Sequence, residues 1–126
     1  MLAGILILGE HDKGFGEPFS LKTVSGRRLR TMVAELDLDV QFGNVFDYCD
    51  GRTSTRDLRA AYSKCRIVVA VGKVASAECA RQGIEHCYLP HPAVRTKAML
   101  DQLRDGLRRL KESNNEMLMP GLLIGE

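Results

Sequence analysis

The sequence has no hydrophobic run long enough to cross a membrane. Residues 1–8, MLAGILIL, are apolar, but a membrane-spanning helix needs about 20 apolar residues. They also lack the basic flank and the cleavage site of a secretion signal. We interpret them as a buried strand and expect a cytoplasmic protein without membrane contact.

The sequence also has no C-x-x-C pair. Its four cysteines are Cys49, Cys65, Cys79 and Cys87. In a chain of intracellular character such cysteines are expected to be free thiols, and their spacing argues against a zinc or iron–sulfur site. His11 and Asp12 beside Glu10 have no third ligand at matching spacing. We therefore expect no metal and no other cofactor.

Complete phosphate-binding motifs are absent as well. The pattern G-x-x-x-x-G-K-[ST] does not occur, which argues against a nucleotide triphosphatase, and residues 9–16, GEHDKGFG, do not meet the dinucleotide spacing G-x-G-x-x-G. Gly72-Lys73 offers only the backbone donors of a helix start and one cation.

A strong net charge is missing too, because 18 basic and 16 acidic residues leave a formal charge of +2. Only local basic patches could attract phosphate. One candidate patch holds Arg27, Arg28 and Arg30, and a second begins at Arg95 and Lys97. The second patch equally fits the solvated face of an amphipathic helix, since acidic residues are interspersed in it.

What the sequence does contain is a regular alternation of apolar runs that predicts one α/β domain. The 126 residues are 44% hydrophobic, which suffices for a single core. Strands are expected over 3–8, 39–46, 66–71 and 85–89, and helices over 25–36, 55–63, 74–82 and 96–111. Residues 66–71 are expected at the centre of the sheet. The fold class predicted is a three-layer αβα sandwich with a central, mostly parallel four-stranded sheet over residues 1–112.

Several end signals accompany these elements. Ser25 is expected to cap the first helix, and Gly83 to end the third. Residues 49–55 are expected to form a polar turn. After a Ser-Asn-Asn break, residues 113–126 form an apolar tail, which we expect to pack on the domain or on a protein partner.

Polar residues stand where the expected strands end. Glu10, Asn44, Gly72 and His91 all fall at or just beyond strand carboxyl ends, where open α/β sheets bind ligands. Each of them alone could simply cap a strand or a helix. Together with Phe19, which follows a proline, they supply a carboxylate, an amide, an imidazole and an aromatic ring. Such groups could bind a nucleobase and polarise its glycosidic bond.

Six segments carry a resemblance in this order. They are Gly9-Glu10, Gly16-Glu17-Pro18-Phe19, Ser25-Gly26-Arg27-Arg28-Leu29, Asn44, residues 67–75 (IVVAVGKVA) and His91-Pro92-Ala93. Their order and approximate spacing resemble the uracil-DNA glycosylase superfamily, most of all its thermostable, iron–sulfur type.

The resemblance implies an enzyme that flips uracil or a modified pyrimidine out of single- or double-stranded DNA and hydrolyses its glycosidic bond. Glu10 would position the water and His91 would stabilise the departing base. The implied substrate-binding residues are Phe19, Asn44, Gly9 and Gly72. The implied DNA-binding residues are Arg27, Arg28, Lys73, Arg95 and Lys97, the loop with Val94 and Arg95 pressing into the minor groove.

The sequence also departs from this family. His11-Asp12-Lys13-Gly14 follows Glu10 where the family has Ala-Pro-Gly, the cluster cysteines have no full counterpart, and the segment after Asn44 is shortened. We therefore expect no iron–sulfur cluster. Two alternatives stay open: a catalytically reduced module that binds nucleic acid or a protein partner, and an enzyme that acts on a free base or nucleotide.

Overall fold

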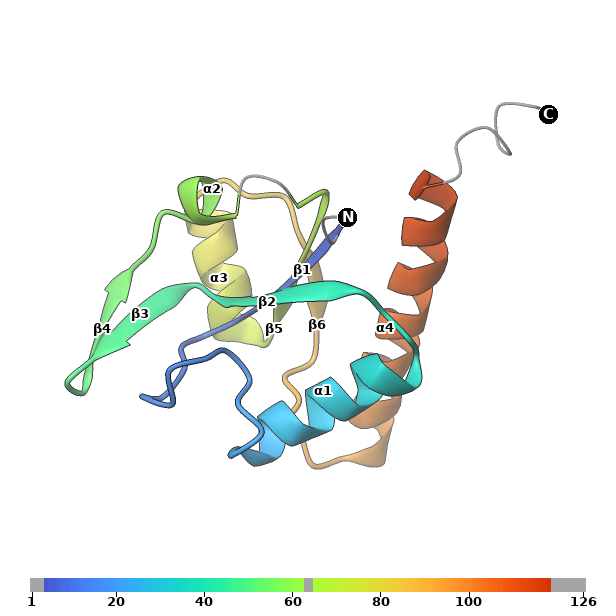
Figure 1. Cartoon of the computed structure of the whole chain (residues 1–126), viewed down its shortest axis with the longest axis horizontal. Coiled ribbons are helices and arrows are strands. Elements are labelled where there is room, and N and C mark those ends of the chain that lie inside the picture. Colours follow the sequence, from blue (N-terminus) through green and yellow to red (C-terminus); the bar gives the residue numbers. More distant parts are fainter. Residues whose placement is uncertain (1–3, 63–64, 119–126) are drawn as a thin grey trace.

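A computed structural model describes residues 4–62 and 65–118, and it contains a parallel sheet with helices packed on both faces (Figure 1). The sheet strands are β1 (Ile5–Gly9), β2 (Val40–Asn44), β5 (Ile67–Val71) and β6 (Cys87–Leu89). The helices are α1 (Val24–Glu35), α2 (Leu58–Ala61), α3 (Lys73–Arg81) and α4 (Lys97–Leu118). Strands β3 (Phe46–Cys49) and β4 (Arg52–Thr55) form a separate antiparallel pair.

The four-stranded sheet has the order β2-β1-β5-β6, and all its pairings are parallel. This confirms the α/β class, the four-stranded parallel sheet and the interior position of the strand at 67–71. The chain passes from β1 to β2 on one side and later to β5 on the other side of β1. A crevice therefore opens beyond the carboxyl end of β1, the position where such sheets bind ligands.

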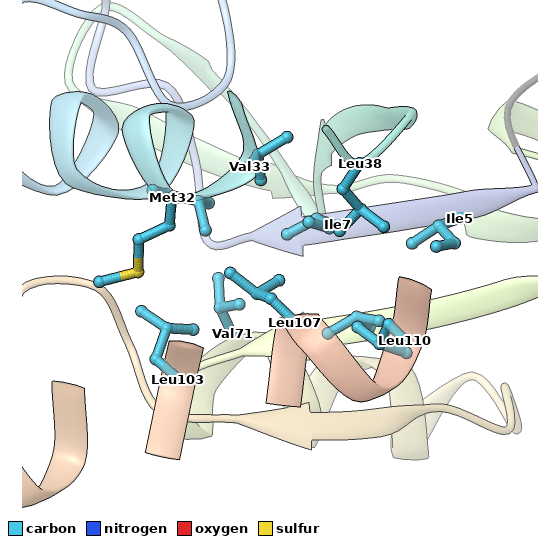
Figure 2. Packing of buried hydrophobic residues seen from close by; sticks show 11 residues of the cluster. Ile5, Ile7, Met32, Val33, Leu38, Val71, Leu103, Leu107 and Leu110 are labelled. Atoms are coloured by element: carbon cyan, nitrogen blue, oxygen red, sulfur yellow. The ribbon is translucent and has the colours of Figure 1, made fainter. Parts of the chain in front are cut away.

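Alternate residues of β1 supply two separate hydrophobic cores. Ile5 and Ile7 face α1 and α4, where they meet Leu107 and its neighbours (Figure 2). Leu6 and Leu8 face α2 and α3 on the opposite side of the sheet. The continuous apolar run of β1 is thus explained by burial on both faces, as is typical of a central parallel strand.

Helix α4 is longer than the sequence predicts. Its buried face carries Leu103, Leu107 and Leu110, and the Lys111 ammonium donates to the Leu36 carbonyl at the end of α1 (2.6 Å). The expected end at 111 is wrong, because the helix continues through the Ser-Asn-Asn stretch to Leu118. Serine and asparagine are only weakly unfavourable in a helix. Residues 119–126 of the expected tail lie outside the described residues.

The β3–β4 hairpin replaces the polar turn expected over 49–55, and it projects away from the four-stranded sheet (Figure 1). Its two central residues, Asp50 and Gly51, have φ values of 50° and 76°. Positive φ at both positions is the conformation of a type I′ hairpin turn, for which Asp-Gly is a preferred pair. The hairpin also confines the helix expected over 55–63 to Leu58–Ala61.

Two helix ends test the sequence signals directly. Thr23, not Ser25, caps α1, since its Oγ1 accepts from the Gly26 amide (2.9 Å) while Ser25 lies inside the first turn. Gly83 ends α3 as expected, with φ at 70° and its amide bonded to the Ala80 carbonyl (3.0 Å). No helix within the described ranges is long and apolar enough to span a membrane.

The turns that end α1 and α3 have the same backbone hydrogen bonds, with Asp37 in one and Gly83 in the other. We therefore expect substitutions at these two positions to change stability in opposite directions. Asp37 after α1 takes the place of Gly83 after α3, and its φ is 52°. A side chain in this left-handed conformation costs about 1–2 kcal/mol. Gly83→Ala should therefore lower the free energy of unfolding by about 1 kcal/mol, and Asp37→Gly should raise it by a smaller amount. Urea titration of both variants checks the signs, and a shift in the same direction would contradict this account.

Candidate functional site

Five of the predicted site residues line one cavity at the carboxyl ends of β1 and β2, and one of them, Gly9, is the last residue of β1. Glu10 follows β1, Asn44 ends β2, Phe19 lies in the loop before α1 and His91 lies in the loop after β6. The cavity measures about 250 Å³. Its lining residues are Gly9, Glu10, His11, Asp12, Lys13, Phe19, Ser20, Thr23, Ser25, Asn44 and His91.

A larger hollow of about 490 Å³ lies beside α2, on the face of the sheet to which Leu6 and Leu8 point. Its walls are mostly apolar and include Leu6, Leu8 and Leu58, with Arg59 and Glu85 as the charged residues. None of the polar residues predicted at the strand ends borders it. The smaller cavity is therefore the better candidate for chemistry, because it gathers titratable and hydrogen-bonding groups.

Phe19 forms one wall of this cavity because Gly9 leaves room for its ring. A Cβ atom at Gly9 would lie 2.6 Å from the ring Cζ of Phe19. The ring also packs against Phe42, with 5.6 Å between centroids and a tilt of 58°. Phe19 has a φ of 52°, so the loop holds it in a conformation that is uncommon for a residue with a side chain. Gly9 thus acts on the pocket through Phe19.

Asn44 places an amide in the wall with only 5% of the residue exposed. Its backbone N–H donates to the Tyr62 hydroxyl (3.2 Å). Its side-chain amide has no hydrogen-bond partner among the residues that the structure describes, and it borders the cavity. An unpaired buried amide is costly. This side chain is therefore suited to bind a polar group that enters the cavity.

His91 has a defined neutral form. The Ala93 amide donates to its Nδ1 (3.0 Å), so the proton of the neutral ring resides on Nε2. Burial, together with the nearby Lys13 ammonium, lowers the pKa of His91, while Glu10 acts in the opposite direction. The ring is half-buried and can donate from Nε2 while it stays uncharged.

Gly72 lies beneath His91 rather than in the cavity wall. A Cβ there would come within 3.1 Å of Cδ2 of the His91 ring, and its φ is 95°. Its amide donates to the Leu89 carbonyl (2.9 Å) and is therefore occupied. The structure thus brings Gly72 next to a catalytic candidate, without aiming its amide at a ligand.

The titration of His91 tests this arrangement without any substrate. We expect its midpoint in a proton NMR titration to lie below 6.5, the value from which it is lowered. Lys13→Ala should raise that midpoint and Glu10→Gln should lower it, because each removes one of the named charges. The pKa of His91 is lower in the folded protein than in the unfolded chain. At a pH between these two pKa values the unfolded chain binds more protons than the folded protein, so the contribution of His91 to the free energy of unfolding is lost as the pH falls from the unfolded pKa to the folded pKa. If the midpoint is unchanged in both variants, the side chains of Lys13 and Glu10 do not lie close to His91.

His11 is a cavity residue whose role the sequence did not reveal. Its ring stacks on Tyr48 of the hairpin, with centroids 4.9 Å apart and 19° between planes. Its Nδ1 accepts from the Lys13 amide (2.9 Å), so a neutral ring carries its proton on Nε2. That atom lies 3.7 Å from the Glu10 carboxylate, which is about half exposed. His11 is thus placed to orient Glu10. The buried Ser20 and the partly buried Thr23 and Ser25 are further lining residues that the sequence did not predict as site residues.

The basic residues predicted to contact DNA differ in their surroundings. Arg27, Lys73, Arg95 and Lys97 are exposed, and among the described residues the Arg27 side chain donates only to the Leu21 carbonyl (3.2 Å). Arg28 is instead half-buried and donates to carbonyls of the loop that follows His91. Among these predicted DNA-binding residues, Arg28 therefore differs from the others because its guanidinium binds backbone carbonyls.

The cysteines do not fit an iron–sulfur cluster. Cys79 is a fully buried residue of α3, and burial beside Glu78 raises the pKa of its thiol to about 11, which disfavours the thiolate that a metal requires. Cys49 and Cys87 are exposed on β3 and β6. Within residues 4–62 and 65–118, no group of three or more His, Cys, Asp or Glu side chains is arranged to hold a metal ion.

The sequence matches no protein-family model and no curated protein. The chemistry has to be inferred from the groups themselves: a carboxylate at the mouth, a neutral imidazole N–H, a buried amide and a phenyl ring. Such a set can hold a planar polar heterocycle and orient a water molecule beside it.

Proposed function

We propose that this protein is a DNA glycosylase-like enzyme of the uracil-DNA glycosylase type. It flips uracil or a modified pyrimidine out of DNA and hydrolyses the N-glycosidic bond. One observation carries the proposal: Glu10, Phe19, Asn44 and His91, from four separate segments, line the same cavity.

Base recognition is proposed to rest on Phe19 and Asn44. A base inside a duplex must leave the stack before an enzyme can enclose it. The Phe19 ring offers a flat apolar surface for the extruded base. The Asn44 amide supplies one acceptor and two donors, which suits the polar edge of a pyrimidine, and its burial makes a wrong edge costly.

Bond cleavage is proposed to rest on His91 and Glu10. As the bond from sugar C1′ to the base nitrogen breaks, its electron pair moves onto the base. The Nε2–H of His91 donates to the base oxygen that gains this charge. The Glu10 carboxylate faces the cationic sugar and orients the water whose oxygen bonds to C1′. The water releases its proton, and the base anion takes up a proton on departure.

We also propose that the domain is a three-layer αβα sandwich. Two separate cores support this arrangement, one between the sheet and α1 with α4, the other between the sheet and α2 with α3. Arg27, Lys73, Arg95 and Lys97 are the proposed DNA contacts, since their exposed side chains leave the charges free for phosphate.

An excision assay tests the proposed function. Single-stranded and double-stranded oligonucleotides that contain uracil are incubated with the protein, and abasic sites are then cleaved with alkali. Strand breaks at uracil that disappear in Glu10→Ala are the expected result. Oligonucleotides in which thymine replaces uracil serve as the substrate control.

A reduced module that binds DNA without excising bases is the second candidate. It is favoured by the position of His11, which lies 3.7 Å from the Glu10 carboxylate and competes with water for it. Gel retardation without strand breaks would support this candidate. If neither breaks nor retardation occur at low salt, both candidates are wrong.

A further inference from the structure

We propose that Arg28 and Arg30 of helix α1 are positioning residues that hold two separate walls of the cavity. This inference rests on the proposed function and extends it to residues outside the cavity lining. It assigns Arg28 a role different from the DNA contact that the sequence predicts.

Arg30 holds the wall that carries Phe19. Its Nε donates to the Phe19 carbonyl (2.6 Å) and its Nη2 to the Pro18 carbonyl (2.8 Å). The guanidinium also lies over the Phe42 ring, 4.5 Å from the centroid. Because Phe42 packs against Phe19, one side chain fixes both the backbone of this loop and the ring that supports Phe19.

Arg28 holds the wall that carries His91. Its Nη1 donates to the carbonyls of Pro92 and Val94, at 2.8 Å each. The loop between them also contains the Ala93 amide that sets the tautomer of His91. The contacts of Arg28 therefore fix the segment that orients the imidazole.

The spacing of the two arginines explains how one helix reaches both loops. Residues two apart on an α-helix point about 200° away from each other. Arg28 and Arg30 consequently extend to opposite sides of α1, and the rigid helix between them fixes the separation of the Phe19 wall from the His91 wall.

The chemistry of the contacts favours arginine. Each side chain donates to two carbonyl oxygens, Arg28 through Nη1 and Arg30 through Nε and Nη2, and Arg30 also stacks on a ring. A guanidinium holds its N–H groups in one fixed plane, whereas a lysine ammonium is a point charge on a flexible stem and does not reproduce that geometry. A phosphate contact, by contrast, largely tolerates lysine. Arg→Lys substitutions keep the positive charge and remove the guanidinium, so they distinguish a positioning role from a phosphate contact.

The experiment compares Arg28→Lys and Arg30→Lys with Arg109→Lys, a substitution at an exposed α4 residue. Hydrogen exchange of the Ala93 amide and the NMR titration of His91 are measured on the free protein. Binding and single-turnover excision are measured with uracil-containing DNA. Thermal unfolding identifies any variant that has lost the fold.

Arg28→Lys is expected to speed exchange at Ala93 and to slow excision about 10- to 100-fold, with DNA affinity unchanged. Arg30→Lys should slow excision similarly and leave Ala93 exchange unchanged. Arg109→Lys should match the parent protein throughout. Unchanged Ala93 exchange in Arg28→Lys together with weaker DNA binding would overturn the positioning role in favour of a phosphate contact. Failure of the parent protein to excise uracil would reject the proposed function alone, because the exchange readout needs no DNA.

Discussion

Replacing His91 by alanine is expected to slow uracil excision by about 10²–10³-fold, or roughly 2.7–4 kcal/mol of barrier, the cost of losing one donor to a developing oxyanion. The rate should fall at saturating DNA, since the donor acts on charge that appears as the bond breaks. Single-turnover rates at pH 7.5 measure this effect. The bound base stays recognised by Asn44, so DNA affinity should change little.

His86 provides the matched control for that substitution. It is also partly buried, but its ring bonds to the Ser76 hydroxyl (2.8 Å) and the Ile84 carbonyl (2.8 Å), away from the cavity. His86→Ala should leave the excision rate nearly unchanged. If His91→Ala retains a rate within about threefold of the parent protein, His91 does not stabilise the departing base.

The pH profile gives an independent check on the same residue. The pKa of His91 is lowered, so the neutral ring persists to a lower pH than in a free histidine. Protonation would occur at Nδ1 and would break the bond from the Ala93 amide. We therefore expect the rate to fall on the acid side of the His91 midpoint and to be flat above it. The midpoint from kinetics should shift upward in Lys13→Ala, as in the NMR titration.

The convergence of the predicted site residues could be anticipated from the sequence. Glu10 follows the apolar run of β1, Asn44 is the last residue of β2, and the carboxyl ends of parallel strands meet at one edge. His91 follows β6, a third strand of the same sheet. The pattern of apolar runs thus sufficed to bring these residues to one edge, since it determines which residues leave the sheet there.

The hairpin could have been anticipated from a local signal. Asp50-Gly51 is a preferred two-residue turn, and Phe46 and Tyr48 alternate with polar residues before it. The flanking runs are short, and β4 carries only exposed polar residues, so burial gives no indication of a strand. The turn pair is therefore the clearest sequence signal for this segment.

The supporting contacts of the site could not be predicted in this way. Arg28 and the carbonyl of Pro92 are 64 residues apart, and the stacking of His11 on Tyr48 depends on where the hairpin folds back. Such contacts depend on how loops cross the ends of the sheet. The sequence around an arginine on a helix surface does not show whether its guanidinium binds a backbone carbonyl or water.

Gly26→Ala is expected to lower the free energy of unfolding by about 3 kcal/mol, at the upper end of the usual cost of overpacking. A Cβ at this position of α1 would overlap the Ser20 carbonyl oxygen and lie 2.6 Å from the carbonyl carbon of Phe19. The obstruction is backbone, which has no rotamer to change. It outweighs the gain of about 1 kcal/mol that alanine brings to a helix interior.

Gly106→Ala in α4 is the matched control. There a Cβ would meet the terminal Cδ2 methyl of Leu89, which can turn aside, so the change should stay within about 1 kcal/mol because the gain in helix propensity offsets it. Urea titration compares the two variants. The molecules of Gly26→Ala that do fold should also excise uracil more slowly than the parent protein, because the displaced loop carries Phe19. Folded Gly106→Ala should excise uracil at the parent rate. Equal stability of the two variants would mean that the Phe19 loop does not rest on α1, and the cavity would lose that wall.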